Sequence, residues 1–125
     1  MTKKEVLNLP GPATRPYSSA VRAGGFIFCS GAIGHVDAKS NPLKGIEAQT
    51  KQCIENLKSA LKLGGASLDD VVKVTVFLTN ADNWAKMNEV YRAAFGKDLP
   101  ARSTVITGLV NADMLIEIEC VAYTP

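Results

Sequence analysis

The segment from Pro100 to Glu117 carries the two side chains best suited to chemistry in this sequence, Arg102 and Glu117, on two strand-like runs joined by a turn. An arginine guanidinium keeps its charge, and its planar fork of N–H donors binds a carboxylate through two hydrogen bonds. A glutamate close by can orient a water molecule or remove its proton. The pair therefore predicts chemistry on a small carboxylic acid, with Arg102 binding the acid group and Glu117 handling a proton.

The neighbours of Arg102 help to decide between this role and a structural one. An arbitrary arginine more often forms a salt bridge at the surface or in an interface. Here Pro100 restricts the chain that enters the strand, and the hydroxyls of Ser103 and Thr104 follow the guanidinium directly in the sequence. This combination favours an anion-binding patch.

Glu117 and Glu119 lie on the same face of the predicted last strand, with Cα atoms about 7 Å apart. Carboxylates at this spacing are usually both solvated. They could also form the carboxylate pair of a glycosidase, but the sequence lacks the aromatic-rich platform that binds sugars. A glycosidase is therefore a remote alternative.

Three residues near the start of the chain are further candidates for the site. Gly31 could let a ligand approach backbone N–H groups closely, although a bulge or a tight turn is at least as common a use of such a glycine. Ser30 lies in Cys-Ser-Gly-Ala, with only the distant His35 as a possible base, so no activated nucleophile is indicated. Tyr17 follows a rigid Arg-Pro pair and could either present its phenol to a pocket or pack in the core.

Length and charge exclude several classes of protein. The 125 residues predict a single domain spanning 1–125, since the chain is too short for two cores. The 14 basic and 12 acidic residues are scattered, without the basic stripe that binds a phosphate backbone, so nucleic acid is not expected as a partner. The start of the chain lacks the apolar core of a signal peptide, and no run is long enough to span a membrane, which predicts a cytoplasmic protein without membrane contact.

The cysteines predict neither a disulfide framework nor a metal site. Cys29, Cys53 and Cys120 are far apart and each lies within an apolar pattern, which indicates reduced thiols in the core. With a single histidine in the chain, close ligand spacing is absent as well, so no metal is expected.

The elements that must position these residues follow from hydrophobic periodicity. Residues 18–22 and 26–30 are predicted strands of a hairpin around a Gly-Gly turn, and 34–45 is a predicted loop. A helix is predicted from residue 46 to the stop at Gly64-Gly65. Its apolar face comprises Ile46, Thr50, Cys53, Ile54, Leu57, Ala60 and Leu61.

The second half of the chain predicts a short capped turn at 67–70, a strand at 71–78, a helix and two more strands at about 101–109 and 114–123. In the strand at 71–78, Val72, Val74, Val76 and Leu78 are predicted to share the apolar face. The second helix has Asn80 or Asp82 as its predicted cap and Gly96 as its end. Its apolar stripe comprises Trp84, Met87, Val90 or Tyr91, and Ala94 or Phe95. This order predicts an α+β sandwich of two layers, with two helices on one face of a mixed sheet.

The face of the sheet away from the helices is predicted to stay partly apolar. In the last strand Ile116, Ile118, Cys120 and Ala122 should meet the helices, whereas Leu115, Val121 and Tyr123 alternate with them on the open face. An exposed apolar patch of this kind usually meets a partner. We expect self-association with candidate sites in the clefts between subunits.

Several motifs combine in a recognisable order. The most specific is Pro-Ala-Arg-Ser-x-Val-x-x-Gly-Leu at 100–109, followed by Ile-Glu-Ile-Glu at 116–119. Supporting motifs are Pro-Tyr-Ser at 16–18, Ser-Gly at 30–31, Val-Lys-Val-Thr-Val-Phe-Leu at 72–78 and Met-Asn-x-x-Tyr at 87–91, with Phe95 after it. With these motifs the sequence resembles the Rid family, the YjgF-like reactive intermediate deaminases, over nearly the whole chain.

The resemblance implies a chorismate-mutase-like α+β fold and a homotrimer with sites between subunits. It implies hydrolysis of 2-imino or 2-enamino acids to 2-oxo acids and ammonia, with no metal or organic cofactor. By position, Arg102 would hold the substrate carboxylate, Glu117 would orient the attacking water, and backbone at Gly31 would assist. Tyr17 and Thr104 would line the pocket, and Ser30 is a weaker member.

The sequence also departs from the pattern of the family. Arg15, Ala32, Thr104 and Val110 stand where many members have glycine, glutamine, cysteine and proline. Arg15 and Ala32 could reshape the pocket, so substrate choice is affected more than reaction type. The main alternative function is a non-catalytic protein that binds 2-oxo acids or similar carboxylates in the same cleft. A role directed at RNA is a third, which the balanced charge disfavours.

Overall fold

The computed structural model describes residues 3–125, which form one mixed sheet, two α-helices and two short 3-10 helices. The six strands lie in the spatial order β1-β2-β3-β6-β4-β5. In chain order the elements are β1 (Glu5–Leu7), β2 (Ala20–Ala23), β3 (Phe26–Ile33), α1 (Ile46–Leu63), η1 (Leu68–Asp70), β4 (Val71–Leu78), η2 (Ala81–Asn83), α2 (Trp84–Phe95), β5 (Ala101–Ile106) and β6 (Ile116–Tyr123).

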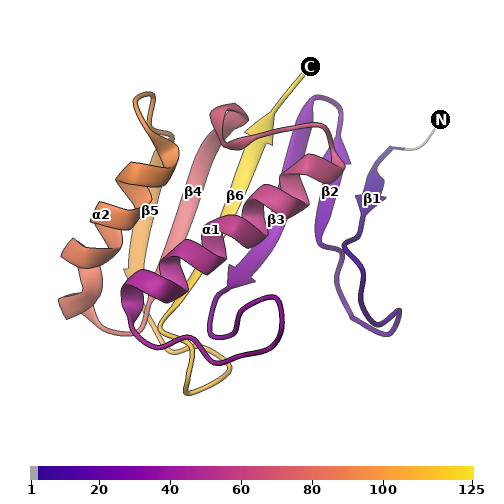
Figure 1. Cartoon of the computed structure of the whole chain (residues 1–125). Helices are drawn as coiled ribbons and strands as arrows, with labels where there is room; N and C mark the ends of the chain where they lie inside the picture. Colours follow the sequence, from indigo (N-terminus) through magenta and orange to yellow (C-terminus); the bar gives the residue numbers. More distant parts are fainter. Residues whose placement is uncertain (1–2) are drawn as a thin grey trace.

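Both α-helices lie on the same face of the sheet (Figure 1), so the molecule has two layers. The strands β4 and β5 are parallel because α2 connects them across this face, and the other neighbouring pairs are antiparallel. This is the predicted α+β sandwich with a mixed sheet. None of the helices in residues 3–125 combines the length and the apolar character needed to cross a membrane.

The helix α1 forms as the periodicity predicts. Every residue of its predicted apolar face is buried, and Gln49 is buried with them. The helix stops at Gly64, whose backbone N–H donates to the carbonyl of Leu61, and Gly65 follows with a positive φ of 75° that suits glycine. The predicted capped turn after it is also present, because the backbone N–H of Ser67 donates to the Asp70 carboxylate at 2.9 Å.

The prediction for the start of β4 was wrong in one respect. Val71 is buried at 6% exposure, and Val72, predicted on the apolar face, is 47% exposed. The reason is a shift in register against β6 between Val71 and Lys73, a bulge that turns the first residues of the strand over. From Val74 onward the predicted alternation holds, and Val74, Val76 and Leu78 are fully buried.

The predicted cap residue Asn80 precedes the 3-10 helix η2, and α2 begins directly after η2. The side chain of Asn80 accepts a hydrogen bond from the backbone N–H of Asp82 at 2.8 Å, as expected for one of the two predicted caps. The buried stripe is Met87, Tyr91 and Phe95. Trp84, predicted in that stripe, is 53% exposed, because the helix starts at the edge of the layer where no second helix covers its first turn.

The last strand alternates as predicted. Ile116, Ile118, Cys120 and Ala122 are buried on the helix side, and the residues between them face the open side of the sheet. All three cysteines are buried and free. The short strand β1, which pairs with β2, was not predicted, because its three residues, Glu5, Val6 and Leu7, are too few to show the alternation of a strand.

The open face of the sheet carries a cluster of aromatic side chains. The rings of Phe26 and Tyr123 lie 4.9 Å apart between centroids, and those of Phe26 and Phe28 lie 6.3 Å apart. All three are between 44% and 47% exposed. Large apolar rings left this open to water are characteristic of surfaces that bind a partner.

Candidate active site

Arg102 points toward the helix layer from the edge strand β5. Its register partner on β4 is Val74, a core residue, so both side chains lie on the helix side of the sheet. The guanidinium carbon lies 4.7 Å from the centroid of the Tyr91 ring, and Nη1 lies 3.9 Å from the sulfur of Met87. The ring face holds the guanidinium by a cation–π contact that leaves most of its N–H donors free.

A hollow of about 260 Å³ surrounds this guanidinium, and we call it the Arg102 hollow. Besides Arg102 it is lined by Trp84, Asn88, Tyr91, Arg92, Leu99 and Pro100. Among residues 3–125 the salt bridges are Arg22 with Glu5 and Lys58 with Glu55, so no carboxylate pairs with either arginine of the hollow. A positive site with apolar walls and free donors suits a small anion.

Two buried polar atoms at this hollow have no hydrogen-bond partner among the described residues, Oδ1 of Asn88 and the hydroxyl of Tyr91. Burial raises the pKa of Tyr91 to about 12, against the opposing effect of the Arg102 charge, so the phenol stays protonated and can donate. Buried polar atoms are normally paired, and unpaired ones mark places where water or a ligand completes the structure.

Glu117 lies on the other face of the sheet. On β6 it pairs with Ile33 of β3 and with Phe77 of β4, and its side chain points away from the helices. Burial, and second the like charge of Glu119, raises the pKa of the Glu117 carboxyl above its ordinary value. A carboxylate with a raised pKa is a stronger base near neutral pH than an ordinary surface glutamate.

Gly31 makes room for the Glu117 carboxylate. A Cβ atom added at Gly31 would collide with the Glu117 carboxyl group, so glycine is required by this close approach. The glycine lies in a bulge of β3, where the register against β6 shifts between Cys29 and Ala32. The sequence left a bulge and a ligand site as equal alternatives for Gly31, and the bulge is present beside the predicted catalytic carboxylate.

Tyr17 and Ser30 lie in a second hollow, whose lining includes Asn56, Leu57 and Ala60 of α1 and does not include Glu117. The hollow has a volume of about 190 Å³, and Tyr17, Ser30 and Gly31 are among its lining residues. The Ser30 hydroxyl donates to the carbonyl of Ser18 at 2.6 Å, and the Ser30 backbone N–H donates to the carbonyl of Ser19 at 3.0 Å. Ser30 therefore ties the segment after Tyr17 to β3, which is a positioning role.

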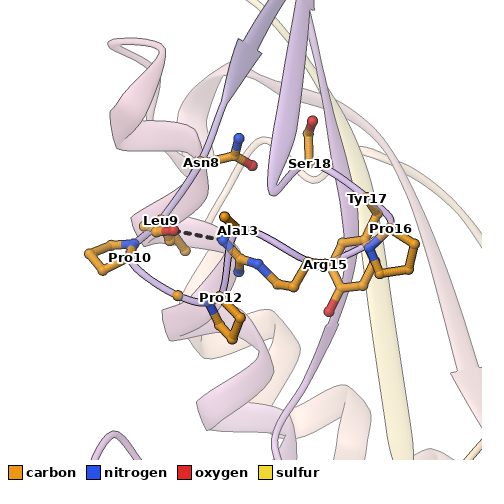
Figure 2. Close-up of a pocket in the computed structure, with 10 residues that line it drawn as sticks. Asn8, Leu9, Pro10, Pro12, Ala13, Arg15, Pro16, Tyr17 and Ser18 are labelled. Carbon is orange, nitrogen blue, oxygen red and sulfur yellow. Dashed lines mark hydrogen bonds between the residues drawn. The ribbon is translucent and has the colours of Figure 1, made fainter.

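A third and larger hollow, of about 430 Å³, lies within the loop of residues 8–18 (Figure 2). Arg15 reaches across this loop, and its Nη2 donates to the carbonyl of Leu9 at 2.8 Å. Tyr17 lines both this hollow and the one at Gly31. Arg15, one of the departures from the family pattern, thus closes the loop that carries Tyr17.

The structure brings the predicted site residues together in two groups. Tyr17, Ser30 and Gly31 line one hollow beside α1, Gly31 also lies against Glu117, and Thr104 shares the helix side of β5 with Arg102. The strands β5 and β6 are consecutive in the chain, but β4 lies between them in the sheet, and Arg102 and Glu117 point to opposite faces. Within one copy of the chain, Arg102 and Glu117 therefore do not face a common pocket.

Of the residues that line the Arg102 hollow, only Arg102 was predicted as a site residue. On α2, Trp84 was predicted in the apolar stripe, Asn88 appeared only within a motif, and Arg92 was not singled out. The positions 84, 88 and 92 are four apart on one helix, so they share a face. Asparagine is a poor helix former, so its presence at position 88, in the middle of the predicted helix, could have indicated a role in the site. Within residues 3–125 no group of three or more His, Cys, Asp or Glu side chains is placed to hold a metal ion.

Residues 9–124 match the model of a protein family described as Endoribonuclease L-PSP. The chain is 47% identical to a RutC family protein of Pyrococcus horikoshii, over 96% of this chain and 98% of that protein. It is 36% identical to a protein of Arabidopsis thaliana named Reactive Intermediate Deaminase A, chloroplastic, over 96% of this chain and 66% of that protein.

A solved structure from Thermotoga maritima is similar along its whole length. It superposes with a TM-score of 0.87 at 41% sequence identity, and the match covers 97% of this chain and 98% of that one. The two-layer arrangement and this superposition confirm the chorismate-mutase-like α+β fold that the sequence predicted.

Proposed function

Because the chain belongs to the Rid family, the family of the RutC and YjgF proteins, we propose that it hydrolyses reactive 2-imino acids, and 2-enamino acids after tautomerisation, to 2-oxo acids and ammonia. The name of the Arabidopsis relative supports this reaction class. The observation that carries the proposal is the Arg102 guanidinium, which lies without an acidic partner in a hollow large enough for a small carboxylic acid.

In the proposed reaction Arg102 holds the substrate carboxylate through two charge-assisted hydrogen bonds. The Glu117 carboxylate takes a proton from a water molecule as the water oxygen bonds to C2 of the protonated imine, and the C=N π electrons move to nitrogen. Glu117 then returns a proton to that nitrogen. The C–N bond breaks as ammonia leaves, and the new hydroxyl gives its proton to the Glu117 carboxylate to become the carbonyl of the 2-oxo acid. Glu117 passes that proton to the departing ammonia, which leaves as ammonium.

This reaction needs few catalytic groups from the protein. A protonated imine is already electrophilic, so fixing its carboxylate and placing one water supplies most of the acceleration. The proposed steps form no covalent bond to the protein and use no cofactor. Backbone at Gly31 and the hydroxyls of Tyr17 and Thr104 would line the pocket, and Ser30 would hold the Tyr17 segment in place.

The proposed site needs two copies of the chain. Arg102 and Glu117 point to opposite faces in one copy, so the Arg102 hollow of one copy must lie against the Gly31 and Glu117 region of the next. The exposed rings of Phe26, Phe28 and Tyr123 form the apolar surface that such an association would bury. A homotrimer with a site in each cleft, the assembly implied by the family resemblance, satisfies this requirement.

The test is hydrolysis of 2-iminopropionate generated in situ, followed as 2-oxo acid formed above the spontaneous rate. Arg102→Ala removes a charge-assisted clamp of roughly 2–5 kcal/mol, so we expect kcat/KM to fall by about 30-fold to several-thousandfold. Arg102→Lys should restore little, because an ammonium lacks the planar fork. Lys86→Ala, an exposed residue on α2 outside the hollow, is the matched control.

Three outcomes separate the alternatives. An Arg102→Ala protein as fast as wild type would remove Arg102 from the site. A wild-type protein that is stabilised against heat by 2-oxo acids, yet never accelerates ammonia release, would be a non-catalytic binder. Cleavage of RNA without hydrolysis of imines would assign the function that the family description names.

A further inference from the structure

The Arg102 hollow contains a second guanidinium. Arg92 lies one helical turn after Asn88 on the same face of α2, and it lines the hollow together with Arg102. None of the lining residues is acidic. Neither arginine pairs with a carboxylate among residues 3–125. Two positively charged side chains therefore line one small space without an acidic lining residue, and Arg92 lies at its exposed rim.

The charges of the proposed reaction leave this space short of one negative charge. The two guanidinium groups and the protonated imine contribute three positive charges, whereas the substrate carboxylate and Glu117 of a second copy contribute two negative ones. A second acidic group on the substrate would balance the count. Arg92 is exposed to water in one copy of the chain, so its charge is hydrated there, and a ligand with a second acid group would gain one further charge-assisted contact.

The geometry leaves room for such a group. The Arg102 guanidinium is held against the Tyr91 ring, which fixes where the first carboxylate binds. Arg92 lies one turn after Asn88 and is the residue next to Tyr91, whose ring contacts Arg102. Asn88 Oδ1 is buried and has no hydrogen-bond partner among residues 3–125, so this oxygen can accept a hydrogen bond from the N–H of a protonated imine.

We propose that the preferred substrates are imines of dicarboxylic amino acids, with Arg102 holding the 1-carboxylate and Arg92 holding the acid group of the side chain. This inference rests on the proposed imine hydrolysis. It assigns Arg92 as the residue that sets substrate choice, a role separate from the chemistry at C2.

Arg92 also lies in the last turn of α2, where a positive side chain complements the helix dipole. That structural role would change the stability of the protein and leave the ratio of two substrates untouched. The ratio of kcat/KM values is therefore the informative measurement.

The experiment compares 2-iminosuccinate with 2-iminopropionate, generated in situ from aspartate and alanine by amino-acid oxidases, on the intact full-length protein. Wild type should favour 2-iminosuccinate. In Arg92→Gln the ratio of the two kcat/KM values should fall by at least about tenfold, the loss of one charge-assisted contact. Arg92→Lys should retain part of the preference, and Lys86→Gln on the same helix should leave the ratio unchanged.

The outcomes keep the two proposals distinguishable. If neither imine is hydrolysed above its spontaneous rate, the proposed function fails and this inference fails with it. If both are hydrolysed and Arg92→Gln leaves the ratio as in wild type, the function stands and the role of Arg92 is overturned. Faster hydrolysis of imines with large apolar side chains than of 2-iminosuccinate would also overturn it, and would point to Trp84 and Leu99 as the side-chain contacts.

Discussion

The environment of Glu117 suits this carboxylate to the proton transfer that we propose for it. Gly31 lets the carboxyl group lie against the backbone of β3, which removes part of its water, and Glu119 adds a like charge on the same face. Both effects disfavour the ionised form, so the pKa rises, with burial as the larger cause. The proton affinity of the proposed base is thus set by residues on either side of it in the sheet.

The first prediction concerns the pH dependence of activity. Glu117 acts in its ionised form, so kcat/KM should fall as the pH drops through its raised pKa. Glu119→Gln removes the like charge, lowers the pKa of Glu117 and should move this acidic limb to lower pH. The shift should be modest, because burial remains.

The measurement is the pH profile of kcat/KM with 2-iminopropionate, corrected for spontaneous hydrolysis at each pH. Glu117→Gln should lose most of the activity and the acidic limb with it. An unchanged limb in Glu119→Gln, or a limb that persists in Glu117→Gln, would assign the titration to another group.

At the scale of elements, α2 organises one half of the candidate site. Trp84, Asn88 and Arg92 are spaced by four and line the hollow, while the buried side chains of Met87 and Tyr91 beside them contact Arg102. The start of this helix depends on the Asn80 cap, which satisfies an N–H group that would otherwise lack a partner. A less stable start of α2 should therefore also disturb the positions of the α2 side chains that line the hollow.

The second prediction follows from this cap. Asn80→Ala should lower the free energy of unfolding by about 1 kcal/mol, the usual cost of losing an N-cap side chain. Asn83→Ala is the matched control, because Asn83 precedes α2 directly but makes no side-chain capping hydrogen bond. Urea denaturation of the two variants measures the difference. Equal midpoints would show that the cap contributes nothing to stability.

At the scale of the whole molecule, the proposed site, with Arg102 from one copy and Glu117 from another, makes self-association a condition of the proposed activity. The sheet leaves its aromatic face open, the helices cover the other face, and Arg102 and Glu117 lie on different sides of it. A copy that stays alone would have a carboxylate-binding hollow without a base and a base without a bound substrate.

The third prediction tests this arrangement by mixing. Arg102→Ala and Glu117→Gln homo-oligomers should each be nearly inactive, but subunits unfolded and refolded together should regain activity. Each site takes one half from each of two copies, so random mixing leaves about a quarter of the sites with both native halves.

The control for mixing is Arg102→Ala refolded with the double variant Arg102→Ala, Glu117→Gln, which contains no native pair of halves. If the mixture of single variants is no more active than the mean of its parents, the site lies within one copy and the two-copy arrangement is wrong.

The sequence by itself determined what depends on near neighbours. The face and the end of α1, the cap of α2 and the hairpin around Gly24 each follow from residues within a few positions, because helix periodicity, capping and positive-φ turns are local interactions. The family also followed from short motifs around Arg102 and Glu117, and the proposed reaction class rests on the same motifs. The roles of the site residues remain predictions.

Only the tertiary structure decided which side of the sheet each residue faces and which strands lie together. A bulge against β6 turned Val72 outward, an uncovered helix start left Trp84 exposed, and the insertion of β4 between β5 and β6 separated Arg102 from Glu117. Pairing partners and registers join residues far apart in the chain, and a change of one residue in register reverses a strand's faces. No local pattern contains that information.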